Sequence, residues 1–121
     1  MKTTKKHFEI FKKEVEKWIK NFGLFDWEIQ VEHGNISNND NSAECQYNIM
    51  AKNAVLRLNT NFTETQPFTD KDVRAAAFHE VAELLLCRLG FLAENRYITY
   101  NEIEIERHSI IARLLNYMID K

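Results

Sequence analysis

Three ionisable side chains lie close together in an otherwise apolar part of this 121-residue chain. His79, Glu80 and Glu83 follow a run of three alanines and a phenylalanine, and they precede three leucines and a cysteine. On a helix, residues four positions apart project from the same face, so we expect His79 and Glu83 to lie one turn apart. An imidazole and a carboxylate at this spacing are suited to binding one metal ion, and Glu80 beside them is a candidate general base.

The same segment nearly matches a short pattern that binds zinc. In H-E-x-x-H, two histidines on one helix face hold the ion and the glutamate acts as base, whereas here Glu83 replaces the second histidine. Because the surrounding residues are apolar, we predict a buried helix in which these groups are paired, protonated or bound to metal. The alternative is a buried polar cluster, in which His79 and Glu83 pair with each other or with Arg74 or Arg88.

A catalytic zinc ion needs a third protein ligand from elsewhere in the fold. His108 is the preferred candidate because it borders the apolar face of the last predicted helix, which a short connector makes a neighbour of the motif helix. His79, Glu83 and His108 would form a set of two histidines and one carboxylate, with the fourth position open to water. The structural alternative for His108 is a core histidine bonded to a carboxylate.

Three other residues are weaker candidates for a ligand role. His7 is expected to be exposed at the start of the first helix, and His33 is expected at the end of a strand. Glu104 lies four residues before His108 and therefore on the same helix face. It can be a ligand, or it can occupy the third helical position of a capping box that begins at Asn101.

Alternating apolar and polar residues predict a small sheet. The alternation is strict over residues 27–33, and it returns over residues 43–49 and 54–59. A short connection joins the last two segments, so we predict that they form an antiparallel hairpin.

Helical spacing of apolar residues predicts three helices around this sheet. The first spans the stripe from Phe8 to Phe22 and ends at Gly23, a natural C-terminal cap. The motif helix begins after Thr69 and is expected to end at Gly90, and the last helix follows residue 101. We predict a single domain over residues 1–121 with an α+β fold: an N-terminal helix, a three-stranded, mainly antiparallel sheet, the motif helix and a C-terminal helix.

The composition excludes several classes of function. A formal net charge of −2 argues against nucleic-acid binding through bulk electrostatics. No apolar run approaches the roughly 18 residues that span a membrane, and the charged N-terminal segment is unlike a signal peptide. Cys45 and Cys87 are too few and too far apart to bind a metal on their own. We expect a soluble protein of the cytoplasm.

The order of these elements, with the His79–Glu83 segment on one helix and His108 on the next, resembles the zincin-like metallopeptidases. The resemblance is to their small SprT-like and minimal gluzincin-type domains, and to small metallopeptidase-like proteins of bacteriophages. It covers most of the chain, from the strand around Trp27–Val31 through the motif helix to the segment 106–114. A phage-encoded protein of this type would act in the host cytoplasm.

The resemblance implies a zinc-dependent peptidase. In that family the motif helix carries two ligands and the general base, and the next helix carries the third ligand. His79 matches the first ligand and Glu80 matches the base, which takes a proton from the metal-activated water. Glu83 departs from the family's histidine, and His108 takes the third position. Candidates for a second electrophile, by position only, are His33, Tyr97 and Tyr100.

The resemblance also implies a substrate. In the zincin fold an exposed edge strand lies along the cleft, and residues 54–59 are expected to be that strand, so an extended segment of a protein or peptide is the expected substrate. Two other functions stay open. One is a catalytically inactive zincin-like module that binds proteins, such as a phage protein that redirects a host factor. The other is a metal-dependent hydrolase of a non-peptide substrate, because a fold does not determine the bond that is cleaved.

Overall fold

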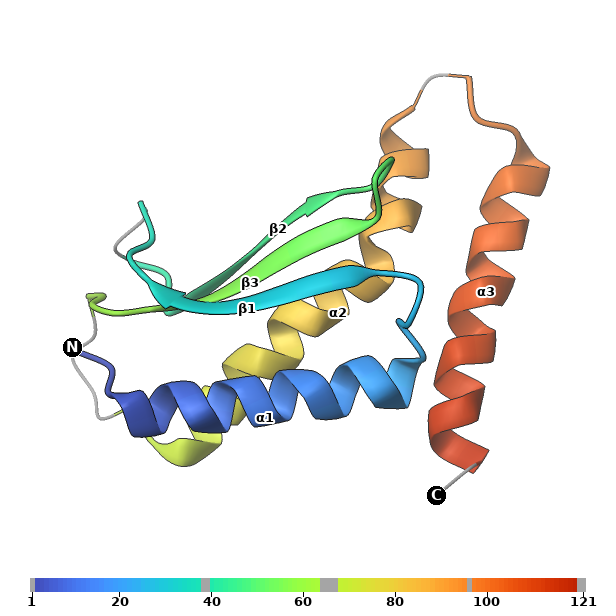
Figure 1. The fold of residues 1–121 in the computed structure, drawn as a ribbon. Coiled ribbons are helices and arrows are strands. Elements are labelled where there is room, and N and C mark those ends of the chain that lie inside the picture. Colours follow the sequence, from blue (N-terminus) through green and yellow to red (C-terminus); the bar gives the residue numbers. More distant parts are fainter. Residues whose placement is uncertain (1, 38–39, 64–67, 96, 120–121) are drawn as a thin grey trace.

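The part of the chain that the structure describes contains three helices and three strands, in the α+β arrangement that the sequence predicts. The structure, a computed structural model, describes residues 2–37, 40–63, 68–95 and 97–119. The elements in chain order are α1 (Lys5–Phe22), β1 (Glu28–Gly34), β2 (Ala43–Asn48), β3 (Asn53–Asn59), α2 (Asp70–Glu94) and α3 (Tyr100–Ile119). Helices α1 and α2 cover one face of the sheet, and α3 stands beside the C-terminal part of α2 (Figure 1).

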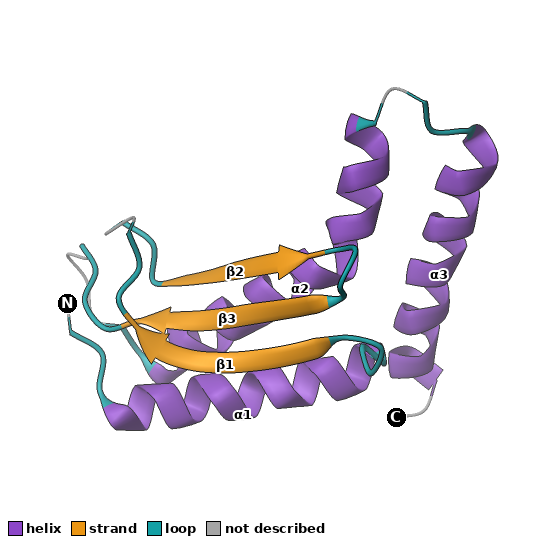
Figure 2. Cartoon of the chain, turned by 45° about the horizontal axis from the view of Figure 1, so that its top comes forward, coloured by secondary structure: helices purple, strands orange, loops and turns teal. Residues whose placement is uncertain are grey.

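The sheet is mixed, and its strand order is β1-β3-β2 (Figure 2). The predicted hairpin is confirmed, because β2 pairs antiparallel with β3 and places Cys45 opposite Leu56. Strand β1 pairs parallel with β3, so the predicted mainly antiparallel sheet is corrected to one parallel and one antiparallel pairing. The prediction that residues 54–59 form an edge strand is wrong, because β3 is central and β1 and β2 are the edges. Alternation reports which face a residue occupies and carries no information on strand direction or order.

The core lies between the inner face of the sheet and helices α1 and α2. Leu56 and Leu58 of β3 are fully buried, whereas Val55 and Arg57, which alternate with them, face outward and are only partly covered. The opposite wall of this core comes from α1 and α2, whose fully buried residues are Phe11, Val15, Val73, Ala77 and Val81. Burial of each large apolar side chain contributes about 1.5–3 kcal/mol to the stability of the fold, so this packing holds the two helices against the sheet.

Two predicted helix ends are confirmed, whereas the end of α2 and the start of α3 differ from the prediction. Gly23 ends α1 in the left-handed conformation at φ 64°, and Thr69 and Asp72 form a capping box at the start of α2. Helix α2 does not end at Gly90 and continues to Glu94. Glycine costs about 1 kcal/mol inside a helix and therefore does not stop one by itself, particularly where Leu92, two residues further, is buried.

On the outer face of the sheet, one arginine side chain connects the three strands. Arg57 of the central strand lies 2.7 Å from Glu32 of β1 on one side and 2.7 Å from Glu44 of β2 on the other. The register places these three residues directly beside one another across the sheet. The guanidinium fork therefore joins all three strands on the face that no helix covers.

A buried asparagine at the end of β3 anchors the segment that leads into β2. The side-chain oxygen of Asn59 accepts hydrogen bonds from the backbone N–H groups of Ile36 and Asn61, at 3.3 and 3.2 Å. Its amide group donates to the carbonyl oxygen of Asn41 at 2.9 Å. Because Asn59 is fully buried, water cannot replace these bonds.

We expect Asn59→Ala to lower the free energy of unfolding by about 1–3 kcal/mol, because it leaves the buried Ile36 N–H without its acceptor. Urea denaturation followed by circular dichroism measures this change. Asn48→Ala is the matched control: its side chain also accepts one backbone N–H, from Ala51, but at an exposed turn. Its cost should stay below about 1 kcal/mol. Equal effects of the two substitutions would contradict an anchoring role for Asn59.

Candidate active site

The rotation of α2 about its axis determines where the motif residues lie. Val73, Ala77 and Val81 are fully buried on the side of α2 that faces the core. His79 and Glu83 project from another side, with 71% and 54% of their side chains exposed, and His79 Nε2 lies 3.3 Å from Glu83 Oε1. The predicted juxtaposition of these two side chains is therefore present, as is the alternative pairing between them.

The prediction that this helix is buried on nearly every face is wrong. Phe78 and Leu86 are 42% and 47% exposed, although their neighbours in the sequence are apolar. Two other helices and one small sheet cannot cover all sides of a 25-residue helix, and α3 stands beside the part of α2 that extends beyond the sheet (Figure 1). An apolar sequence therefore did not imply burial of His79 and Glu83.

Glu80 is the buried member of the motif. It is only 6% exposed, and its Oε2 atom has no hydrogen-bond partner among the described residues. Burial raises the pKa of the Glu80 carboxyl to about 6; the His79 imidazole lowers this pKa, and the carboxylates of Glu83 and Glu44 raise it further. A carboxyl group with this pKa can exchange a proton near neutral pH, which is the property of a general acid or base.

A hollow of about 300 Å³ opens beside Glu80, next to the β2 edge of the sheet. Ala76, His79 and Glu80 of α2 form one wall, and Ala43 of β2 with the preceding segment 40–42 forms the other. Asn59 holds this segment through the carbonyl group of Asn41. The hollow therefore has one wall fixed by the core packing of α2 and another fixed by a buried hydrogen bond.

The structure does not bring His108 to this hollow. His108 Nε2 lies 3.4 Å from Glu104 Oε2, and 73% of the His108 side chain is exposed. The side of α3 that faces inward carries Glu106, which pairs with Arg88 of α2, and the buried Ile110. Residues two positions apart on a helix differ by about 200° in direction, so His108 points away from α2.

The described residues contain no group of three or more His, Cys, Asp or Glu side chains placed to hold a metal ion. Two of the three predicted ligands, His79 and Glu83, are together, and His108 is elsewhere. The ligand role of His108 stays a prediction.

The alternative interpretation of Glu104 as a capping residue is wrong. Helix α3 is capped two residues earlier, where the Thr99 hydroxyl accepts a hydrogen bond from the Glu102 N–H at 3.2 Å and donates to its carboxylate at 3.1 Å. Glu104 lies inside the helix and contacts Arg107 and His108. A threonine followed three residues later by a glutamate was present in the sequence as the signal for this cap.

The weaker candidates have structural roles away from the hollow. His33 stacks on Phe8 with ring centroids 5.2 Å apart, and its Nε2 lies 2.7 Å from the Thr3 hydroxyl. Burial, and then the nearby His7, lower the pKa of His33. His7 is half-buried rather than exposed, and its Nδ1 accepts a hydrogen bond from the Thr4 N–H.

The two tyrosines that were considered as electrophiles are not held in any site. Tyr97 and Tyr100 flank the start of α3 and are 84% and 73% exposed. Because nothing buries them against other elements, the structure offers no means of orienting them toward Glu80.

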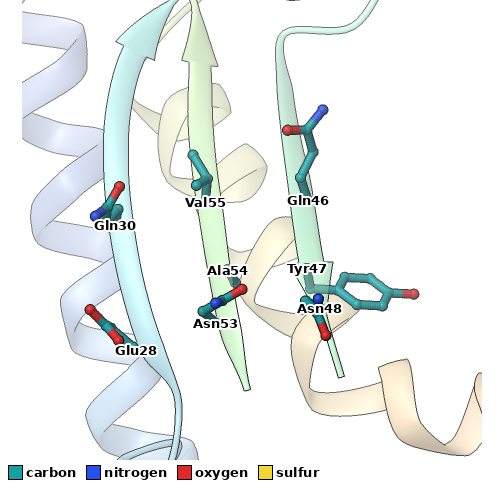
Figure 3. Close-up of a pocket in the computed structure, with 8 residues that line it drawn as sticks. All are labelled: Glu28, Gln30, Gln46, Tyr47, Asn48, Asn53, Ala54 and Val55. Carbon is teal, nitrogen blue, oxygen red and sulfur yellow. The ribbon is translucent and has the colours of Figure 1, made fainter. Parts of the chain in front are cut away.

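A hollow of about 400 Å³ on the outer face of the sheet has a different character. Figure 3 shows its side chains on the face with the helices behind, contributed by all three strands: Glu28, Gln30, Gln46, Tyr47, Asn48, Asn53, Ala54 and Val55. Amides dominate, and Glu28 is the one carboxylate among these described residues. The described lining of this hollow therefore offers no histidine or cysteine beside Glu28, and the Glu80 hollow is the better candidate for chemistry.

No protein-family model, curated protein or solved structure matches this chain. The resemblance to zincin-like peptidases thus rests on the residues quoted above. Among the described residues, no helix is both long enough and apolar enough to cross a membrane.

Burial of the ionised Glu80 carboxylate should lower the free energy of unfolding as pH rises toward and beyond 6. The folded state binds the proton more tightly than the unfolded chain, whose carboxyl has a pKa near 4.5, so stability is lost as pH rises from about 4.5 to 6. We expect Glu80→Gln, measured by urea denaturation in the presence of EDTA, to be more stable than wild type by up to ~2 kcal/mol at pH 7.5. The difference should vanish near pH 4.5, and a difference that does not change with pH would contradict the raised pKa.

Proposed function

We propose that the protein is a zinc-dependent hydrolase of the zincin-like type that uses Glu80 as its general base. The observation that carries the proposal is the Glu80 carboxylate, which is 6% exposed, lacks a partner for Oε2 and lines a hollow beside the His79–Glu83 pair. Leaving a buried carboxylate unsatisfied costs free energy, and such costs are concentrated at functional sites.

The chain fits a zinc ion only in part. His79 and Glu83 offer a nitrogen and an oxygen donor from one exposed face of α2, which suits zinc. A catalytic site takes three protein ligands, and the described residues bring no third donor to this pair. In the proposal His108 takes the third position, which it does not reach from its present side of α3.

Glu80 supplies the chemistry that this chain itself contributes. Above pH 6 most of the carboxylate is ionised and can take a proton from a water molecule in the hollow. After attack on a carbonyl group, the protonated Glu80 can return that proton to the leaving nitrogen. Zinc, when bound, supplies Lewis-acid polarisation and lowers the pKa of water.

The expected substrate is an extended polypeptide. Strand β2 is an edge strand, and its first residue, Ala43, lines the Glu80 hollow. A peptide that adds to the open edge of β2 would lie beside Glu80. Strand β2 thus takes the role that the sequence had suggested for residues 54–59.

Zinc binding tests the ligand set. We expect wild-type protein, stripped with EDTA and dialysed, to bind one Zn²⁺ in isothermal titration calorimetry. His79→Ala and Glu83→Ala should weaken binding by about tenfold or more, since each removes a donor. His7→Ala is the control and should bind as wild type does.

The same titration decides the third ligand. The proposed set predicts that His108→Ala weakens binding as much as His79→Ala does. Unchanged affinity in His108→Ala would remove His108 from the site, and a wild-type protein that binds no zinc would end the hydrolase proposal.

Activity tests the base. We expect zinc-loaded protein to cleave fluorescently labelled casein, with a rate that falls when the pH is low enough to protonate Glu80, because the base must be ionised. Glu80→Gln should retain zinc and lose activity by about 10²- to 10⁴-fold. Cleavage that persists in Glu80→Gln would contradict this mechanism.

A second candidate function is protein binding without catalysis. The observation that favours it is the missing third ligand among the described residues. Under this alternative, wild-type protein binds no zinc, and the exposed His79–Glu83 pair has no catalytic role.

A further inference from the structure

A second hollow, of about 370 Å³, lies on the other side of Glu83 from the Glu80 hollow. We call it the Phe91 groove, after one of the exposed apolar residues that line it. The end of β2 forms one wall and the C-terminal half of α2 forms the other, where α2 extends past the sheet (Figure 1). Its described lining residues are Tyr47, Ile49, Glu83, Leu86, Cys87, Gly90, Phe91 and Glu94.

The floor of the Phe91 groove is apolar and open to solvent. Tyr47, Leu86 and Phe91 are 45%, 47% and 43% exposed, and they come from two elements that face each other. Single exposed apolar side chains are common on proteins, whereas several that converge in one concave site mark a binding surface. Gly90 adds no side chain between them, which leaves the middle of the groove open.

Both ends of the Phe91 groove are acidic. Glu83 and Glu94 are eleven positions apart on α2, which separates them by roughly 16 Å along the helix axis. Among the described lining residues there is no lysine or arginine to neutralise them. Arg88, on the same stretch of helix, lies on another side of α2 and pairs with Glu106 of α3.

We propose that the Phe91 groove binds a short extended segment of another protein that carries apolar side chains between two basic residues. The apolar side chains contact Leu86 and Phe91, and the basic residues approach Glu83 and Glu94. Side chains of an extended segment alternate between its two faces, and the chain advances about 3.3 Å per residue. A spacing of six residues keeps both basic side chains on the face that carries the apolar ones, and it places them roughly 20 Å apart, enough to span the two glutamates. The end of β2, at Tyr47, borders the groove and offers its open edge for backbone hydrogen bonds to one end of the bound segment. Binding requires neither zinc nor Glu80, so this interaction goes beyond the proposed catalytic function.

The test uses fluorescein-labelled heptapeptides and metal-free protein in EDTA. We expect the acetylated peptide Arg-Ala-Leu-Ala-Phe-Ala-Arg to bind wild-type protein in fluorescence anisotropy, with an affinity that falls as salt increases. The matched peptide Glu-Ala-Leu-Ala-Phe-Ala-Glu should bind at least tenfold more weakly. Equal binding of the two peptides would overturn the proposal, as would no binding of the arginine peptide.

Two substitutions, each with a matched control, locate the binding. Phe91→Ala should weaken binding of the arginine peptide by about tenfold, and Glu94→Lys should weaken it and reduce its salt dependence. Phe25→Ala removes a phenylalanine that is 74% exposed outside the groove, and Glu9→Lys makes the same charge change on the exposed surface of α1. Both controls should stay within about twofold of wild type. Equal losses in the controls would place the binding elsewhere.

Sedimentation velocity tests whether the Phe91 groove is instead occupied by a second copy of this chain. We expect wild-type protein to be monomeric at the concentrations of the peptide assay. A dimer that Phe91→Ala converts to monomer would show that the groove is a self-association surface and would overturn the proposed partner. Because these experiments contain no zinc, their outcome is independent of the zinc titration.

Discussion

One packing constraint determines the surface of this protein: the buried face of α2 must meet α1 and the sheet. Val73, Ala77, Val81 and Leu84 recur at spacings of three and four, and each is almost completely excluded from solvent. Rotating the helix by one residue would expose these side chains and bring polar ones into the core, at a cost of several kcal/mol. The direction of every other side chain on α2 follows from this packing.

The residues next to that buried face form a strip along β2. Ala76, Glu80, Glu83 and Cys87 continue the same spacing one position to the side, and they line the Glu80 hollow and the Phe91 groove. Glu80 lies at the boundary between core and solvent, which explains both its burial and its raised pKa. The catalytic proposal and the binding proposal thus depend on one helix orientation and one open sheet edge.

The two proposals use the shared Glu83 differently. In the Glu80 hollow, Glu83 is a donor paired with His79, and in the Phe91 groove it is a negative charge at one end. A peptide laid along β2 would pass both places, so binding in the groove would also bring a polypeptide near Glu80. If the protein is a hydrolase, the groove would select its substrate; if it is a binding module, the groove would act alone.

The sequence by itself determined the elements, their caps and the pairing of His79 with Glu83, because these depend on residues within a few positions of one another. The capping rule was applied to Asn101, although Thr99 also fits it, and this placed the start of α3 two residues too late. Only the tertiary structure decided that β2 is an edge, that His79 is exposed while Glu80 is buried, and that His108 faces away from α2. Strand order and helix rotation result from the packing of distant segments against one another, which periodicity within one segment does not encode.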